Sequence, residues 1–260
     1  MRLKEQTYLS EKVNWYDSIK DIGNIEGCII SNELIDNFSV HPVVMEDELM
    51  EVFVGYDQEF IELLQPATAA LKNYLSELGI ELPAGYKAEI NLEAILWIQD
   101  IATFLESGYV ITIDYGSDSA GLYKQYRENG TIVCYNKHHV NDCPYKNIGE
   151  QDITSHVNFS ALYHWGLKNG LALSGFTDQA HFLLSLGIND HLKNVGDNIN
   201  GENIIKKCRE NALLRHILLL EMGHKYKVLI QQKGLPVHKL KGLELFTEQI
   251  DANKTIATLY

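Results

Sequence analysis

The sequence predicts an α/β fold built on a doubly wound sheet, and three observations support this prediction. Short apolar runs at 25–30 and 109–113 end abruptly on polar residues, which is typical of buried parallel strands. Segments with helical periodicity lie between and after these runs. The chain has 260 residues, 45% of them hydrophobic, so it is long enough for one large core or for a domain with a subdomain.

The first half of the chain is expected to contain a β-rich insertion. A helix tail at 3–9 and a short strand at 13–15 precede the buried strand at 25–30. An antiparallel meander is then expected over 41–64, because β-rich stretches alternate there with acidic or polar turns. Two helices, separated by a Pro-Gly turn, lead to the next buried strand; their expected ranges are 67–78 and 92–105.

The second half is expected to be mostly helical. A helix should follow Gly116, and a short strand at 131–135 should lead into a long polar loop that extends to Asp152. Helical periodicity dominates 159–220, and a final strand is expected at 226–231. These elements divide the chain into three predicted parts, which are a partial core, an inserted subdomain and the rest of the core with a helical end: 1–40, 41–107 and 108–260.

Charge and targeting signals limit the class of protein. The formal net charge is -13, which repels phosphate backbones and anionic membranes and favours a cationic partner. No apolar stretch approaches the length of a membrane span, and the first residues lack the apolar core of a signal peptide. We therefore expect a cytoplasmic protein that binds no nucleic acid and does not insert into membranes.

The four cysteines are too few and too scattered for a disulfide framework, so we interpret them as reduced thiols. Cys134, His138, His139 and Cys143 lie in one polar segment and are residue types that bind zinc. Their spacing is not a standard zinc spacing, so we predict no metal site there.

Five segments resemble successive motifs of the MidA family: SNELIDNFSVH, GYVITIDYGSDSAGLY, GTIVCYNKHHVNDCPYKNIGEQDITSHVNFSAL, GFTDQAHFLLSLGI and MGHKYKVLIQQKGL. This family comprises S-adenosylmethionine-dependent methyltransferases and includes the mitochondrial complex I assembly factor that methylates a protein arginine. The resemblance implies a Rossmann-like class I methyltransferase sheet, S-adenosylmethionine as the cofactor and a protein substrate, such as a respiratory-complex subunit. The chain departs from the family at Ser39, where proline is usual, and at Asn158, where an acid is usual.

The resemblance also implies a segment that this sequence does not contain. Family members carry a glycine-rich loop after their first strand and an acidic residue after their second, whereas no Gly-x-Gly-x-x-Gly pattern occurs in these 260 residues. We therefore expect the chain alone to bind the cofactor weakly or not at all. We also expect it to associate with itself or with an upstream fragment.

The strand ends supply the candidate catalytic residues. Glu33 follows the first buried strand and Asp36 lies one turn on, and two carboxylates can hold a guanidinium and polarise one of its nitrogens. His156 could accept the proton that the nitrogen loses. The alternative is that Glu33 and Asp36 only open a helix and interact with its dipole, and that His156 has a structural role.

Further residues are expected to bind substrate or cofactor. Candidates for contacting the substrate lie after the second buried strand and in the polar patch of the family motif: Asp114, Tyr115, Gly116, Gln151 and Asp152. Candidates for contacting the cofactor follow the early strands: Trp15, Asp17, Ser18, Ser31 and Asn32. Structural roles, as a strand-to-helix turn or as core, are the alternatives for Gly116 and Trp15.

Two classes of function follow from these features. The first is a MidA-like protein arginine methyltransferase. The second is a non-catalytic relative that acts as a partner-binding or assembly module.

Overall fold

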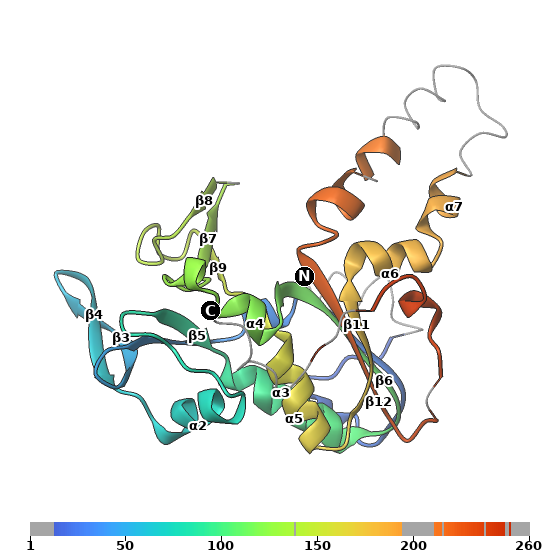
Figure 1. Cartoon of the computed structure of the whole chain (residues 1–260), viewed down its shortest axis with the longest axis horizontal. Helices are drawn as coiled ribbons and strands as arrows, with labels where there is room; N and C mark the ends of the chain where they lie inside the picture. The colour runs from blue at the N-terminus through green and yellow to red at the C-terminus, as the bar shows by residue number, and fades with distance from the viewer. Residues whose placement is uncertain are drawn as a thin grey trace.

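The computed structural model describes residues 13–137, 139–193, 211–214, 216–236, 238–247 and 250 (Figure 1). Its main sheet has the order β1-β6-β12-β11, and the strands are β1 (Ile25–Asn32), β6 (Leu105–Ser117), β12 (Tyr226–Lys233) and β11 (Ala172–Asp178). β1 runs parallel to β6, whereas β12 is antiparallel to both of its neighbours. The α/β prediction is confirmed, with a mixed sheet.

The predicted meander is a four-stranded antiparallel sheet in the order β4-β3-β2-β5. Its strands are β2 (His41–Met45), β3 (Leu49–Asp57), β4 (Glu59–Pro66) and β5 (Lys87–Ile90). The strand β5 was not predicted, because its four residues follow a helix and pair with β2 more than 40 positions earlier in the chain. In Figure 1 this inserted sheet extends to one side of the main sheet.

Two helices follow the predicted ranges closely: α2 (Ala69–Glu77) and α3 (Leu92–Phe104). The helix α5 (Phe159–Lys168) starts where the mostly helical region was expected to start. The buried positions of α3, including Ile98 and Ile101, recur at three- and four-residue spacing, and Asn91 caps its start by accepting the Ala94 N–H at 2.7 Å. The helices α3 and α5 contact each other (Figure 1), and one buried core spans both sheets.

A small third sheet lies where the sequence predicted one strand and a polar loop. Its order is β8-β7-β9, with β7 (Val133–Asn136), β8 (His139–Asn141) and β9 (Asp152–Thr154). Strand β9 begins at Asp152, where the expected loop ends, and no strand was predicted there. Its three residues are polar or exposed, including Ile153, and therefore carry no burial signal in the sequence.

The remaining elements are short. They are β10 (Val157–Asn158), α4 (Ser119–Leu122), α6 (Gln179–Ser185), α7 (Ile188–Lys193), the 3-10 turns η1 (Ile19–Asp21), η2 (Ile35–Asn37), η3 (Gln125–Arg127) and η5 (Lys241–Leu243), and the π-helical η4 (His216–Glu221). The strand expected at 13–15 does not form, and the helix expected at 3–9 lies outside the described residues. Within the part of the chain that the structure describes, no helix is both long and apolar enough to cross a bilayer.

The mostly helical region expected over 159–220 contains α5, α6, α7 and η4, but the strand β11, which was not predicted, interrupts it. The two faces of β11 pack differently: Phe176 contacts Phe159 of α5, whereas a Cβ at Gly175 would meet Leu243 of η5 at 2.4 Å. Neighbouring residues of a strand point to opposite faces, so β11 is covered on both sides. Its mixed composition gives little period-two alternation, which explains why the pattern suggested a helix.

The strand β1 is not buried, contrary to expectation. Ile30 is 66% exposed and Cys28 is also exposed. The strand pairs with β6 on one side, and no strand among the described residues pairs with its other edge. Such an edge exposes unpaired backbone groups that favour association with another strand.

We expect the chain to self-associate through this edge. Replacing Ile30 by lysine places a charge on the exposed edge and should shift the sedimentation equilibrium towards the monomer. The control Leu167→Lys, at a 48% exposed position of α5, should leave the association constant unchanged. A monomeric wild-type chain, or equal effects of the two substitutions, would contradict the role of this edge.

Candidate functional site

The candidate site lies where β1 and β6 end together. The carboxylate of Asp114, near the end of β6, binds the backbone of the turn that follows β1. Its Oδ2 accepts the Ile35 N–H at 2.9 Å and, at longer distances, the N–H groups of Leu34 (3.3 Å) and Asp36 (3.4 Å). Its Oδ1 accepts the Tyr115 N–H at 2.8 Å. One buried side chain thereby fixes the backbone that carries Glu33 and Asp36.

Glu33 has a left-handed backbone conformation, with a φ of 48°. This conformation is uncommon outside glycine and is maintained only where surrounding contacts impose it. Here the Glu33 N–H donates to the Ile113 carbonyl at 3.0 Å, and the Asp114 contacts hold the next residues. The Glu33 side chain is exposed, and its Oε2 accepts the Tyr226 hydroxyl at 3.2 Å.

Asp36 lies close enough to Glu33 for their charges to interact. Burial, followed by the negative charge of Glu33, raises the pKa of Asp36 above its ordinary value. The Asn37 side chain donates to Asp36 Oδ1 at 2.7 Å and partly offsets this shift. Two neighbouring carboxylates that repel each other favour the binding of a cation between them.

A cleft of about 210 Å³ opens beside Asp36. Phe38 and Ser39 line one wall, and Ile153 and Thr154 of β9 line the other. Small-molecule pockets usually measure about 300–1,000 Å³, so this volume suits a single side chain better than a whole nucleoside cofactor. The cleft brings Ile153 and Thr154 of the predicted polar patch next to Asp36, one of the two predicted carboxylates.

An aromatic wall lies next to this site. The ring of Tyr115 contacts His156 edge-on at a centroid distance of 4.2 Å and also contacts Tyr226 at 5.6 Å. Burial and the charge of Glu33 raise the pKa of Tyr226, so its hydroxyl remains a hydrogen-bond donor. The strand β12 runs antiparallel, so its first residue lies at the edge where β6 ends. The sequence analysis missed Tyr226, which an antiparallel assignment of the last strand would have revealed.

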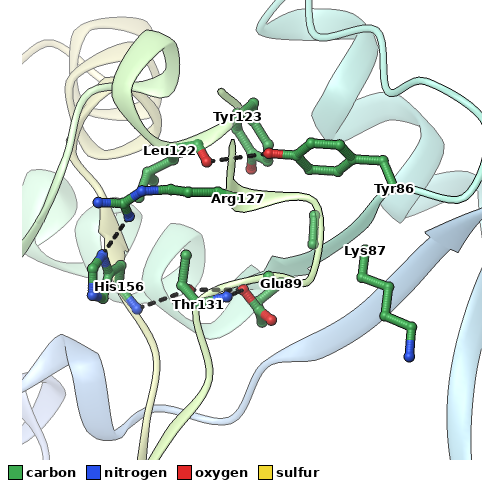
Figure 2. A pocket seen from close by; sticks show the side chains of 10 residues that line it. Tyr86, Lys87, Glu89, Leu122, Tyr123, Arg127, Thr131 and His156 are labelled. Atoms are coloured by element: carbon green, nitrogen blue, oxygen red, sulfur yellow. Dashed lines mark hydrogen bonds between the residues drawn. The ribbon is translucent and has the colours of Figure 1, made fainter. Parts of the chain in front are cut away.

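The contacts of His156 differ from those expected of a proton acceptor. Arg127 donates to its Nδ1 at 2.7 Å, as Figure 2 shows. Burial, then the Arg127 charge, lowers the pKa of His156 to about 4, so the ring is neutral at physiological pH. The lone pair of Nδ1 is already used, and the proton of this tautomer lies on Nε2. These contacts suit a structural or donor role and argue against a general base.

The surroundings of His156 are rigid and nearly filled. The buried carboxylate of Glu89 accepts the N–H and hydroxyl of Thr131 at 2.8 and 2.7 Å, and the Thr131 hydroxyl also accepts the His156 N–H (Figure 2). The cavity among these residues measures about 10 Å³. This is at most the size of one water molecule, so it is no cofactor site.

Three further predicted substrate residues have structural contacts. Asp114 is 0% exposed and lies beneath the site. A Cβ at Gly116 would meet the Val157 carbonyl at 2.1 Å, so glycine is needed where β10 pairs with β6. The Gln151 amide donates to the carbonyls of Cys143 and Pro144 and holds the loop in place. Asp152 is exposed on β9.

The predicted cofactor residues are not brought together. Ser31 and Asn32 end β1 beside Glu33, whereas Trp15, Asp17 and Ser18 lie near η1. The two groups lie near different ends of α3. At the start of α3, Glu93 accepts the Ser39 N–H of the candidate site at 3.1 Å. Towards its end, Asp100 forms an ion pair with Lys20 of η1 at 3.1 Å. Seven helical residues rise about 10 Å, so the η1 group lies towards the opposite end of the sheet. Ser18 instead caps η1, together with Asp21.

The predicted absence of a metal site concerned Cys134, His138, His139 and Cys143. His138 lies outside the described residues. Cys134 is buried in β7, His139 is exposed in β8, and Cys143 donates to Asp142 at 3.4 Å. Cys28, Cys134 and Cys143 form no disulfide bond.

The fold and the acidic site at the carboxyl ends of its strands define a Rossmann-like α/β protein with a side-chain-sized cleft. Residues 1–177 match the family described as "Putative S-adenosyl-L-methionine-dependent methyltransferase". The match covers more than half of the chain, and the chain belongs to this family.

Two solved structures from Burkholderia thailandensis are similar to the chain. One is a candidate methyl transferase bound to S-adenosyl-homocysteine; it is 29% identical, with a TM-score of 0.82 over 93% of this chain and 62% of that chain. The other, an uncharacterized protein in its native form, is 28% identical, with a TM-score of 0.84 over 95% of this chain and 67% of that chain. The chain thus spans less than two thirds of the first relative. No curated protein matches it.

The pKa of Asp114 gives a testable pH dependence. Burial raises it from 3.8 to about 6, although the N–H groups of Tyr115, Ile35 and Asp36 oppose the shift. The folded chain therefore holds this proton more tightly than the unfolded chain. The Asp114 contribution to stability is greatest below pH 4 and is lost as the pH rises through about 6.

We expect the free energy of unfolding of the wild type, minus that of Asp114→Asn, to fall between pH 4 and pH 7. Asparagine cannot titrate, so the subtraction isolates this group, and a shift of about two units corresponds to on the order of 3 kcal/mol. Urea denaturation at several pH values measures the difference. A difference that is flat, or that rises with pH, would show that the carboxyl group is not protonated as described.

Proposed function

We propose that the chain is part of an S-adenosylmethionine-dependent protein methyltransferase of the MidA type, which methylates an arginine side chain. The observation that carries the proposal is the pair of interacting carboxylates Glu33 and Asp36, of which Asp36 lines a cleft of about 210 Å³. Membership of the methyltransferase family and the S-adenosyl-homocysteine bound to one relative support the choice of cofactor. The protein substrate remains a prediction, as do the respiratory-complex subunit as its identity and the cytoplasmic location.

The site chemistry suits a guanidinium. Arginine stays protonated at any working pH and presents a planar fork of N–H donors, which two carboxylates can accept. Tyr226 holds one oxygen of Glu33 and so limits the rotamers of that side chain. The formal net charge of -13 adds long-range attraction for a cationic segment. Such a segment would enter the cleft between η2 and β9.

Asp36 is the better candidate for the proton acceptor. The nitrogen that gains a methyl group must lose one proton, and Asp36 lines the cleft that the substrate side chain would enter. His156 is instead neutral and holds Tyr115 in place through their edge-on contact. We assign the grip on the guanidinium to Glu33 and the proton transfer to Asp36.

The residues at the end of β1 fit one part of the cofactor. The Ser31 hydroxyl is buried and has no hydrogen-bond partner among the described residues, and the exposed Asn32 amide lies beside it in the chain. Both suit the polar amino-acid end of S-adenosylmethionine. When bound, that cofactor supplies a methyl group on a sulfonium. Asp17 and Ser18 do not fit this place, because they lie towards the other end of the sheet.

The exposed edge of β1 favours the second candidate function, a partner-binding or assembly module. An unpaired strand edge that carries Ile30 can accept a strand from another polypeptide. The two candidates differ in what they require of Glu33. A binding module needs the edge, whereas a methyltransferase also needs the carboxylate.

Replacing Glu33 by glutamine should reduce methylation by roughly thirty-fold to several hundred-fold. The change keeps the shape but removes the charge, and a charge-assisted contact to a buried guanidinium contributes on the order of 2–4 kcal/mol. The rate is measured on a fusion of the chain with a family-type amino-terminal segment, using an arginine-containing protein substrate. Glu26→Gln, at an exposed position of the same strand, is the matched control and should leave the rate unchanged.

Cofactor affinity and melting temperature are measured on the same preparations. We expect both to be nearly unchanged in Glu33→Gln, because Glu33 faces the substrate. Unchanged turnover together with a lowered melting temperature would assign Glu33 to a helix-opening role and would refute its role in catalysis.

A further inference from the structure

A cluster of one aspartate and two histidines lies beside the candidate site but is not part of it. Asp178 ends β11, His181 belongs to α6, and His224 precedes β12. The Nδ1 atom of His181 lies 2.8 Å from Asp178 Oδ1, and the Nδ1 atom of His224 lies 2.8 Å from Asp178 Oδ2. One ligand atom from each residue lies within 4.8 Å of the others.

Local packing holds these three side chains in place. The Asp178 carboxylate also caps α6 by accepting the His181 N–H at 2.8 Å. The Ala180 N–H donates to the Gly223 carbonyl at 3.0 Å, which fixes the backbone next to His224. A Cβ at Gly223 would meet the Ala180 Cβ at 2.7 Å, so only glycine permits this approach.

The His181 ring has a further neighbour, because the ring of Phe246 lies 4.8 Å from it between centroids. This contact restricts the imidazole to the orientation in which its Nδ1 faces Asp178. The cluster is thus organised by three separate segments of the chain: the β11–α6 junction, the residues before β12 and the segment that follows η5.

The spacing of the cluster is close to that of a coordination shell. Two ligands bound to one zinc-type cation at about 2.1 Å and at the tetrahedral angle lie about 3.4 Å apart. The two histidine Nδ1 atoms lie 2.8 Å from different oxygens of Asp178, about 0.6 Å closer than this, and one ligand atom from each residue lies within 4.8 Å of the others. A cation could therefore replace the two shared protons with small rotations of the side chains.

We propose that Asp178, His181 and His224 bind a divalent transition metal ion of the zinc type. Neutral imidazole nitrogen and carboxylate oxygen are the ligands that this class of ion accepts, whereas Mg²⁺ and Ca²⁺ prefer sites built from oxygen. Each ring binds through Nδ1, so the proton that Nδ1 donates to Asp178 in the free chain is lost to solvent and the ring carries its single proton on Nε2. Water molecules complete the coordination.

The exposure of the cluster agrees with this site. The Asp178 side chain is 6% exposed, whereas that of His224 is 60% exposed, which gives an ion a path from solvent.

The proposed metal site is separate from the carboxylate pair of the candidate site. In the main sheet, Lys227 is paired with Asp114 on one side and with Asp178 on the other. Adjacent strands lie about 4.8 Å apart, so Asp178 is roughly 10 Å from Asp114. The ion would tie α6 to the start of β12, the strand that carries Tyr226, and would stabilise that edge of the sheet.

Calorimetric titration of the full chain with Zn²⁺, and absorption titration with Co²⁺, test the proposal. We expect one ion per chain, with no competing binding by Mg²⁺. His224→Ala and His181→Ala should each weaken the affinity for Zn²⁺ by at least about tenfold, since each removes a ligand. His224 is largely exposed, so its substitution should leave the circular dichroism spectrum and fold intact.

The matched control is His164→Ala, because His164 also contacts a carboxylate, that of Glu77, at 2.8 Å but has no second histidine. Its affinity for Zn²⁺ should equal that of the wild type. Three results would overturn the proposal: no saturable binding at micromolar Zn²⁺, binding that both histidine substitutions leave unchanged, or binding that Cys143→Ser abolishes. The last result would place the ion in the cysteine-containing segment instead.

Discussion

The candidate site depends on one buried carboxylate. Asp114 offers its two oxygens to the backbone N–H groups that start η2 and to Tyr115, and it thereby joins the ends of β1 and β6. Without these acceptors the N–H groups of a buried turn would lack partners, which is costly. The same contacts hold the backbone after Glu33 and support its left-handed conformation. The positions of Glu33 and Asp36 therefore follow from a buried residue beneath them.

This arrangement concentrates negative charge at one edge of the sheet. Asp36 and Asp114 both have raised pKa values, for which burial is the main cause, and neighbouring carboxylates contribute. A guanidinium placed between Glu33 and Asp36 would relieve the repulsion and lower the pKa of Asp36. The Tyr226 hydroxyl donates a hydrogen bond to Glu33 and so stabilises this carboxylate without adding a charge to the site. Under the proposed function, this negative charge would attract the guanidinium of the substrate.

Strand ends were the part of the site that the sequence could predict. Asp36 and Thr154 line one cleft, and Glu33 and Tyr115 both contact Tyr226, because the carboxyl ends of parallel strands meet at one edge. The burial of Asp114 could not be predicted, since a polar residue after an apolar run is equally compatible with an exposed or an inward position. The hydrogen bond between Arg127 and His156 joins residues 29 positions apart, so the local pattern could not show that His156 is neutral.

The strands that the sequence analysis did not predict were missed for the same physical reason. The strands β9 and β11 have sequences of mixed polarity, and each forms because a distant or neighbouring strand offers a ladder of partners. The contact between Asp178 and His224 spans 46 positions and depends on the antiparallel return of β12. By contrast, the caps and periodicity of α3 are local, and its range was predicted to within one residue. Local sequence patterns thus predicted helices such as α3. The protonation of His156 and the contacts of Asp178 depend on burial and on residues distant in the sequence.

The most direct test of the central claim is a crystal structure of the chain in complex with an arginine-containing peptide. Our account predicts that the guanidinium lies between Glu33 and Asp36, with the Tyr226 hydroxyl still bound to Glu33 and Asp114 still bound to the turn backbone. A guanidinium bound elsewhere, with Glu33 and Asp36 contacting only solvent or their own backbone, would contradict the account.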